Sequence, residues 1–249
     1  MKLALAIASL TSASMAMAGG SCGPANLAAW DDVRDDSGSQ VQVVDGGLGG
    51  TTCSATFEST ADNSDRGRLQ DRNSMCETSY RARFLLDVDA LGTLASNERT
   101  KLNNVQCVTA DTGGTLTCDG IGMAQFRLQG NDDGTGNILR SFVADANQAD
   151  LRNRFDVPLV AGENAVEYQW IQASAAGVSD GIMRVWFPGN TDEASPDVEL
   201  TDLNNGGYCV TQINLGLIQA TNAWTTRLAG TAFTIDEFES RRQTGIGVN

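Results

Sequence analysis

The residues that could do chemistry in this sequence are defined first by an absence, because none of its 249 residues is a histidine. Without imidazole, Ser-His-Asp and Cys-His catalysis are excluded, and the most common side-chain metal ligand is missing. A Schiff-base lysine would have to be Lys101, which lies in a polar segment with nothing nearby in the sequence to depress its pKa. We therefore expect no nucleophilic catalysis of these kinds.

Paired carboxylates are the next candidates, since laminarinase-like glycosidases use an E-x-D-x-x-E strand whose carboxylates share one face. No Glu in this chain is followed two positions later by Asp. Glu237 and Glu239 share a face, but Asp236 falls on the opposite one. The missing motif and the missing histidine together favour a binding protein over an enzyme.

Aromatic side chains could stack on sugars if their faces are exposed beside polar groups. Trp224 lies in a polar stretch between the last two expected strands, and Trp186 alternates onto the same side as Arg184. These two tryptophans are candidate sugar-binding residues. The alternative, favoured for large aromatic residues in general, is that both pack under loops or behind the sheet.

Arginines form a further candidate set. Alternation places four of them on the outward sides of their strands, where they would crowd one sheet face if the strands are neighbours: Arg81, Arg83, Arg127 and Arg184. Such a face could grip carboxylated or sulfated glycans through bidentate hydrogen bonds. The favoured alternative is cross-strand pairing with carboxylates such as Glu167 or Asp236.

One turn gathers enough side-chain oxygens to be a candidate calcium site: Asn131, Asp132, Asp133 and Asn137. Its spacing does not match the twelve-residue EF-hand loop. A solvated hairpin loop is the favoured alternative. No other cofactor is expected.

The N-terminus is typical of a secretory signal peptide. Lys2 precedes a mostly apolar run over residues 3–10, and a small-residue A-x-A sequence ends at Ala18. We expect cleavage after Ala18, followed by a single β-sandwich domain over residues 19–249 in a secreted or periplasmic protein. The apolar run is too short to span a bilayer, and no later segment is apolar enough to do so.

The charge balance excludes one class of partner. The chain has 17 basic and 31 acidic residues, a net charge of −14, whereas a protein that binds phosphate backbones needs a basic face. We therefore expect no nucleic acid partner. A carbohydrate or another surface polymer is the expected ligand, and the oligomeric state is left open.

All six cysteines follow the expected signal peptide, and their even number in an exported chain favours three disulfides. Cys107 and Cys118 flank a predicted turn at 111–114, so we expect them to form a cross-strand pair. The other four allow three pairings, among which the sequence does not choose: Cys22, Cys53, Cys76 and Cys209.

These residues must be positioned by about a dozen short strands, because alternating apolar and polar runs recur between clusters of Gly, Asn and Asp. We expect strands over residues 40–44, 53–58, 80–88, 105–109, 115–118, 124–129, 139–144, 166–172, 182–187, 209–217 and 232–238. Short helices are expected over residues 91–102 and 147–154. The pattern predicts an all-β fold, a two-sheet antiparallel β-sandwich.

Four stretches carry a resemblance to known proteins: YRARF at 80–84, VEYQW at 166–170, GIMRVWF at 181–187 and FTIDEFESRR at 233–242. In this order they resemble the concanavalin A-like, laminin G-like jelly-roll domains of bacterial exported proteins, a family of unassigned function. The resemblance implies two packed antiparallel sheets, one of them concave. The cysteines and the hairpin at 105–118 depart from the family pattern.

Together these observations predict an exported, non-catalytic β-sandwich that binds a carbohydrate or another extracellular polymer. A structural or interaction protein of the cell surface or extracellular matrix is the alternative, and a polysaccharide-degrading enzyme ranks third. Solution mass separates the first two, because a filament or large assembly favours the structural interpretation.

Overall fold

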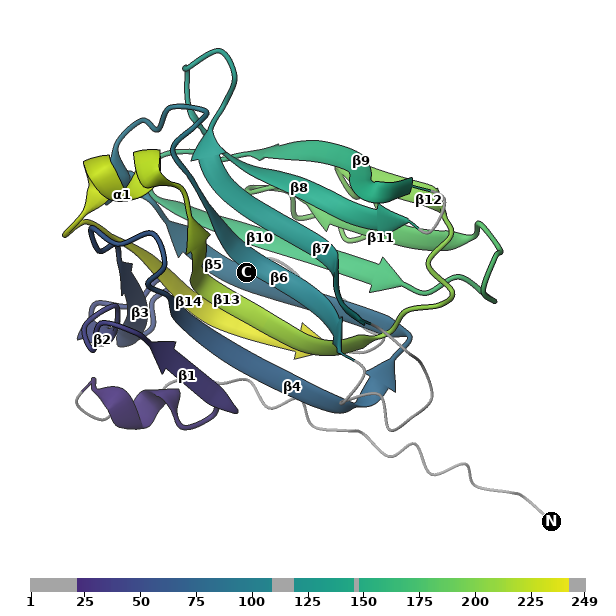
Figure 1. Cartoon of the computed structure of the whole chain (residues 1–249), viewed down its shortest axis with the longest axis horizontal. Helices are drawn as coiled ribbons and strands as arrows, with labels where there is room; N and C mark the ends of the chain where they lie inside the picture. The colour runs from purple at the N-terminus through teal and green to yellow at the C-terminus, as the bar shows by residue number, and fades with distance from the viewer. Residues whose placement is uncertain (1–21, 109–118, 146–147, 242–249) are drawn as a thin grey trace.

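The computed structural model describes residues 22–108, 119–145 and 148–241, which fold into two antiparallel sheets (Figure 1). Sheet A has the order β1 (Asp32–Asp35), β4 (Gly67–Glu77), β13 (Val210–Ala220), β6 (Arg99–Val108), β7 (Asp119–Gly130), β8 (Asn137–Asp145) and β9 (Gln148–Pro158). Sheet B has the order β12 (Val198–Leu203), β11 (Gly181–Trp186), β10 (Glu163–Ile171), β5 (Ser79–Asp87), β14 (Ala232–Arg241), β3 (Cys53–Glu58) and β2 (Val41–Asp45). The short helices are η1 (Pro24–Leu27), η2 (Asp89–Leu91) and α1 (Asn222–Leu228).

The core lies between the sheets because alternate residues of each strand point inward. Tyr80, Phe84, Tyr168 and Trp170 of sheet B are buried there, and Phe126 of β7 packs against Tyr168 with ring centroids 5.0 Å apart. Each such side chain contributes roughly 1.5–3 kcal/mol by its removal from water. The predicted antiparallel β-sandwich is confirmed, with sheet A toward the viewer in Figure 1 and sheet B behind it.

Two helix predictions are wrong. Residues 91–102 were expected to form a helix, but β6 begins at Arg99 and pairs with both β7 and β13. Residues 147–154 were expected to form another, but β9 runs over Gln148–Pro158 beside β8. In both places cross-strand pairing satisfies the backbone and overrides a weak local preference.

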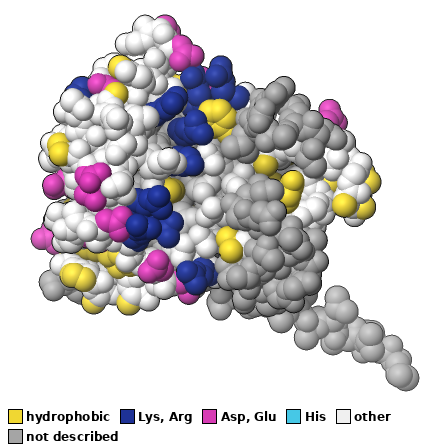
Figure 2. Space-filling view, in the orientation of Figure 1, with side chains coloured by type: hydrophobic (Ala, Val, Ile, Leu, Met, Phe, Trp, Pro, Cys, Tyr) yellow, Lys and Arg dark blue, Asp and Glu magenta, His cyan; other side chains and the backbone are white. Residues whose placement is uncertain are grey.

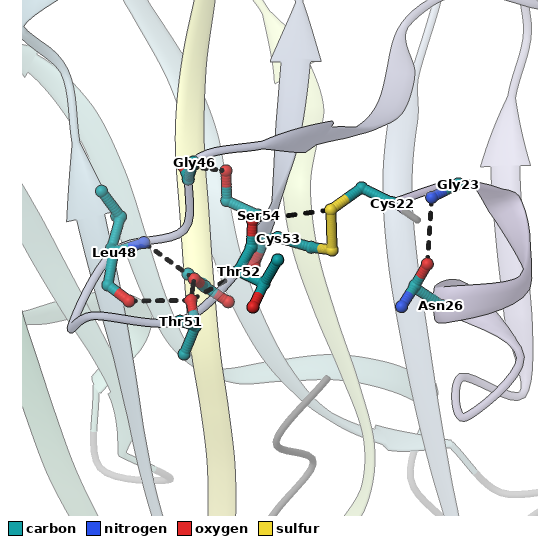
Figure 3. The surroundings of a disulfide bond; sticks show 10 residues. Cys22, Gly23, Asn26, Gly46, Leu48, Thr51, Thr52, Cys53 and Ser54 are labelled. Atoms are coloured by element: carbon teal, nitrogen blue, oxygen red, sulfur yellow. Dashed lines mark hydrogen bonds between the residues drawn. A yellow bond between two sulfur atoms is a disulfide. The ribbon is translucent and has the colours of Figure 1, made fainter. Parts of the chain in front are cut away.

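Two disulfides join segments that are distant in the sequence. Cys22 bonds Cys53, which ties the segment before η1 to the start of β3, next to a turn held by a hydrogen bond from Ser54 Oγ to Gly46 O (3.2 Å) (Figure 3). Cys76 bonds Cys209 and links the end of β4 to the residue before β13. Together these bonds select one of the three pairings that the sequence left open.

Only one cysteine of the third expected disulfide lies among the described residues. Cys107 is disulfide-bonded, but its expected partner Cys118 lies outside the described residues. The expected signal peptide, residues 1–18, also lies outside them. Across the described ranges, no helix combines the length and apolar character needed to cross a membrane, and the disulfides fit an extracellular protein.

Candidate functional site

The outer face of sheet A carries a row of amide side chains at matching positions of four central strands. Alternation turns their apolar neighbours, such as Leu69 and Ile213, toward the core. The amide row consists of Gln70 on β4, Gln212 and Asn214 on β13, Asn104 and Gln106 on β6, and Gln125 on β7.

Hydrogen bonds fix the orientation of most of this row. Gln70 Nε2 donates to Asn214 Oδ1 at 2.9 Å, and Asn214 Nδ2 donates to Gln106 Oε1 at 2.6 Å. Gln212 Nε2 donates to the same Gln106 oxygen at 3.0 Å. Amides held in place by one another are preorganised donors and acceptors for hydroxyl and carboxylate groups.

Basic side chains border the amide row. This cation cluster consists of Arg66, Arg68, Arg72, Arg99, Lys101 and Arg127. Figure 2 shows Lys and Arg side chains in a band down the middle of the face that Figure 1 presents. Within the described part of the chain, no member of the cluster forms an ion pair with a carboxylate. This part of the surface is therefore locally basic in a protein with a net charge of −14.

The pKa values within the cluster follow from burial and mutual repulsion. Burial lowers the pKa of Lys101, and Arg127 and Arg66 lower it further. Burial also lowers the pKa of Arg127, with a smaller contribution from Arg99. The sequence-based view that nothing depresses the pKa of Lys101 is therefore wrong, because the lowering groups come from other strands and from a loop.

The surface is hollowed at one end of the cluster. A cavity of about 210 Å³ is lined by Arg99, Thr100, Lys101, Arg127, Gln219, Ala220 and Thr221. Lys101 on β6 is paired in register with Arg127 on β7 and with Gln219 on β13, so three strands build its walls. Arg127 also donates to Gln125 Oε1 at 3.3 Å. Through Arg127 the cavity is therefore continuous with the amide row.

The outer face of sheet B holds the other predicted arginines in a different state. Arg81 pairs with the buried carboxylate of Glu167 and, at 3.2 Å, with Glu193. Arg184 pairs with Glu199. Arg83 stands between Glu167 and Glu239 in the strand register. The four arginines were expected to share a face only if their strands are neighbours, and this condition fails for Arg127, because β7 belongs to sheet A and the strands of Arg81, Arg83 and Arg184 belong to sheet B.

The predicted tryptophans do not offer exposed faces. Trp186 is 3% exposed, lies under the Arg81 guanidinium at 4.1 Å and donates its Nε1 proton to Asp192 O. Trp224 is fully buried and contacts Phe233 edge-on. The polar stretch that contains it forms helix α1, whose first turn is capped because Thr221 Oγ1 accepts a hydrogen bond from Trp224 N.

The predicted calcium ligands lie in and beside the turn between β7 and β8. Asp132 pairs with Arg140 at 3.0 Å, while Asn131 and Asp133 accept hydrogen bonds from Thr135. Asn137 donates to Gly92 O. Among the described residues, no group of three His, Cys, Asp or Glu side chains is placed to hold a metal. Calcium binding by this loop stays a prediction, tested by thermal unfolding with calcium and with a chelator.

Comparison with known proteins identifies neighbours by structure alone, because no family model and no curated protein sequence matches the chain. A double mutant of alginate lyase Aly36B, solved with an alginate trisaccharide, has a TM-score of 0.64 at 11% identity, covering 94% of this chain and 98% of that one. An endo-β-1,4-glucuronan lyase from the fungus Trichoderma reesei has a TM-score of 0.57 at 16% identity, covering 86% and 91%. The PL-14 alginate lyase of Aplysia kurodai has a TM-score of 0.59 at 9% identity, covering 87% and 93%.

These neighbours share the jelly-roll β-sandwich fold with this chain, whereas the particular laminin G-like family is not matched. They also contradict the expectation of a non-catalytic protein, because the solved structures that share this fold are mostly alginate and glucuronan lyases, at 9–16% identity. The expectation failed because the missing histidine and the missing E-x-D-x-x-E strand exclude a few chemistries only. Elimination from a uronic acid requires neither of them.

Sequence reasoning also missed the amide row. Its signal is present in the printed sequence, where Asn or Gln alternates with apolar residues at 104–106, 125–129 and 212–214. What the sequence lacks is the strand order, since β13 separates β4 from β6 although it lies more than 100 residues away along the chain. Only the folded sheet brings these amides together.

Proposed function

We propose that the protein is a polysaccharide lyase that cleaves a uronate-containing polysaccharide on the outer face of sheet A. The observation that carries this proposal is the cation cluster, whose members form no ion pair with any carboxylate among the described residues and lie beside the amide row of an acidic protein. A polymer of uronic acids supplies the carboxylates that such a surface needs. The shared fold with alginate and glucuronan lyases supports the same reading.

Cleavage by elimination removes the proton from C5, the ring carbon next to the carboxylate. The electrons of the C5–H bond form the C4–C5 double bond while the C4–O bond breaks, and the leaving oxygen takes up a proton. The reaction needs cations or amide donors at the carboxylate, where negative charge develops, and a base within reach of C5. In this site Arg127 is the proposed carboxylate contact, held by its hydrogen bond to Gln125.

Lys101 is the proposed base. Burial and the neighbouring arginines lower its pKa, which increases the fraction of neutral amine at a given pH and makes it a better proton acceptor under working conditions. Its register neighbour Arg127 lies on the next strand, so base and carboxylate contact stand side by side. The three tyrosines, Tyr80, Tyr168 and Tyr208, are not part of this face: the first two are buried in the core and the third packs against it.

The test is product analysis after incubation with glucuronan, polymannuronate and polyguluronate. A lyase leaves an unsaturated uronate end that absorbs in the ultraviolet, and the combined mass of its products equals that of the substrate, whereas a hydrolase adds one water per cut. We expect unsaturated ends from at least one polymer and none from a neutral glycan. Products that carry an added water, or no cleavage of any uronan, would overturn the proposal.

The role of Lys101 has its own test. Lys101→Met should lower kcat by about 10²–10⁴-fold, the usual contribution of a general base. The rate of the unsubstituted enzyme should rise with pH through a midpoint below the ordinary pKa of lysine. A variant with unchanged kcat and an unchanged pH profile would remove Lys101 from the mechanism.

A further inference from the structure

The Asn104 side chain is a buried polar group with no partner among the residues that the structure describes. It lies on β6 in the middle of the amide row and is 7% exposed. Its Oδ1 is buried and accepts no hydrogen bond from any described residue. A buried acceptor left unpaired is unfavourable, so such a group in a candidate site points to a ligand that completes it.

Gln125 presents the complementary group at the same place. Its Oε1 accepts from Arg127, while its Nε2 donates to no described residue. Asn104 Oδ1 and Gln125 Nε2 both lie 2.8 Å from the point where a side chain on Gly122 would begin. An unpaired acceptor and an unpaired donor therefore converge above this glycine, which is partly exposed on the outer face of sheet A.

A β-bulge explains the convergence. Gly122 is paired with Gln106, whereas Ala124 is paired with Val105, so Met123 is an extra residue in β7. Met123 and Ala124 both point into the core. The bulge brings Gln125 back toward Gly122 and re-aims its amide, as bulges beside functional sites commonly do.

We propose that Asn104 Oδ1 and Gln125 Nε2 bind one hydroxyl group of a substrate sugar and thereby select its configuration. A hydroxyl donates one hydrogen bond and accepts others, so it satisfies both atoms at once. A carboxylate has no proton for Asn104, and an ammonium group has no acceptor for Gln125. This inference rests on the proposed lyase function and adds the part of the substrate that the site recognises, namely the configuration of one sugar hydroxyl.

Glucuronan and polymannuronate provide the probe, because their β-1,4-linked sugars differ in the configuration of a single ring hydroxyl. Oligosaccharides of the two polymers are compared by calorimetric binding and by kcat/KM. We expect the unsubstituted protein to prefer one of them by at least tenfold, since losing a hydrogen bond at a site built for it costs about a factor of ten.

Two substitutions should reduce this preference to within about threefold. Asn104→Leu removes the acceptor, and Gly122→Ala places a methyl group where the two amides converge. Gly136→Ala is the matched control, because its added methyl meets nothing and its backbone is not in a left-handed conformation. Asn104→Leu should leave the melting temperature unchanged or raise it, since it removes a buried unpaired group. Retained stability together with lost selectivity would show that the two amides recognise the substrate hydroxyl and do not merely support the fold.

The outcomes separate the two proposals. Selective binding without unsaturated products would overturn the proposed lyase reaction, while the proposed recognition of a sugar hydroxyl would still stand. The proposed recognition of a hydroxyl would be overturned if the unsubstituted protein had equal affinity for both sugars, or if the selectivity persisted in Asn104→Leu. Either result would count whether or not the polymer is cleaved. In that case water alone would satisfy the two amides.

Discussion

The two outer faces of the sandwich use arginine in opposite ways. On sheet B, Arg81 and Arg184 are paired with carboxylates of neighbouring strands and of a loop. On sheet A, Arg68 and Arg127 border an amide row and pair with no described carboxylate. The same residue type therefore forms structural ion pairs on one face and is a proposed binding group on the other, and outward alternation alone does not distinguish the two.

The difference has an energetic signature. A buried ion pair is strongly disturbed when one partner is removed, because the other charge is left uncompensated. A cation without a partner carries its desolvation and repulsion in the unliganded protein, and the bound anion offsets them. Substitutions on sheet B should therefore reduce stability, and substitutions on sheet A should reduce function.

The largest expected difference between the two faces is in catalysis. Arg127→Ala should lower kcat/KM toward the cleaved uronan by about 100–1000-fold, because it removes a donor from the carboxylate of the reacting sugar. Arg184→Ala is the matched substitution on sheet B and should leave kcat/KM within about twofold. Initial rates of ultraviolet absorbance measure both. Equal losses in the two variants would abolish the functional distinction between the faces.

The sequence predicts those features of the two faces that depend on neighbouring residues in the chain, and not those that depend on residues of other strands. Alternation within a strand correctly gives the inward set of β5 and β10 and the outward positions of Arg81 and Arg127, since it needs only neighbours in the chain. The partners of those arginines depend on strand order. Arg81 meets Glu167 because β5 lies beside β10, and Lys101 meets Arg127 because β6 lies beside β7.

The candidate site is hidden from the sequence for the same reason. The lowered pKa of Lys101 arises from burial and from Arg127 and Arg66, none of which a local window contains. The convergence of Asn104 and Gln125 needs a bulge at Met123, and a bulge shifts the alternation on which face assignment relies. Sequence reasoning therefore gives the fold class and the inner faces but not the site.

The next effect concerns stability and lies on sheet B. Glu167→Gln should lower the free energy of unfolding by about 3 kcal/mol, because the buried Arg81 guanidinium loses its buried charged partner and keeps only the exposed Glu193. Chemical denaturation monitored by tryptophan fluorescence measures the change. Glu199→Gln, which removes the more exposed partner of Arg184, should cost no more than about 1 kcal/mol. A loss below 1 kcal/mol in Glu167→Gln would mean that the ion pair between Arg81 and Glu167 does not stabilise the fold.

A smaller effect is expected from a carboxyl group behind sheet A. Burial raises the pKa of Asp71 to about 6, and the nearby Asp31 adds to this. Between the ordinary pKa near 4 and this value the folded protein binds more protons than the unfolded chain, so stability falls as the pH rises through the window. After allowance for partial exposure the loss is about 1–2 kcal/mol.

The variant Asp71→Asn isolates this contribution, since other carboxyls titrate equally in both proteins. The difference in unfolding free energy between Asp71→Asn and the unsubstituted protein should grow by that amount between pH 4 and pH 7. A difference that is independent of pH would show that burial does not raise the pKa of Asp71 in the folded protein.

The smallest expected change in stability is on sheet A, where it has the opposite sign to that on sheet B. Burial lowers the pKa of Arg68, and Arg34, Arg66 and Arg72 lower it further, so its charge is unfavourable in the unliganded protein. Its Nε is buried without a partner among the described residues. Arg68→Met keeps the packing of the aliphatic stem and should leave the unfolding free energy unchanged or raise it by up to about 1 kcal/mol.

The same variant should bind uronan oligosaccharides several-fold more weakly and with a shallower salt dependence, because one screened charge contact is lost. Loss of stability together with unchanged binding would place Arg68 with the structural arginines of sheet B.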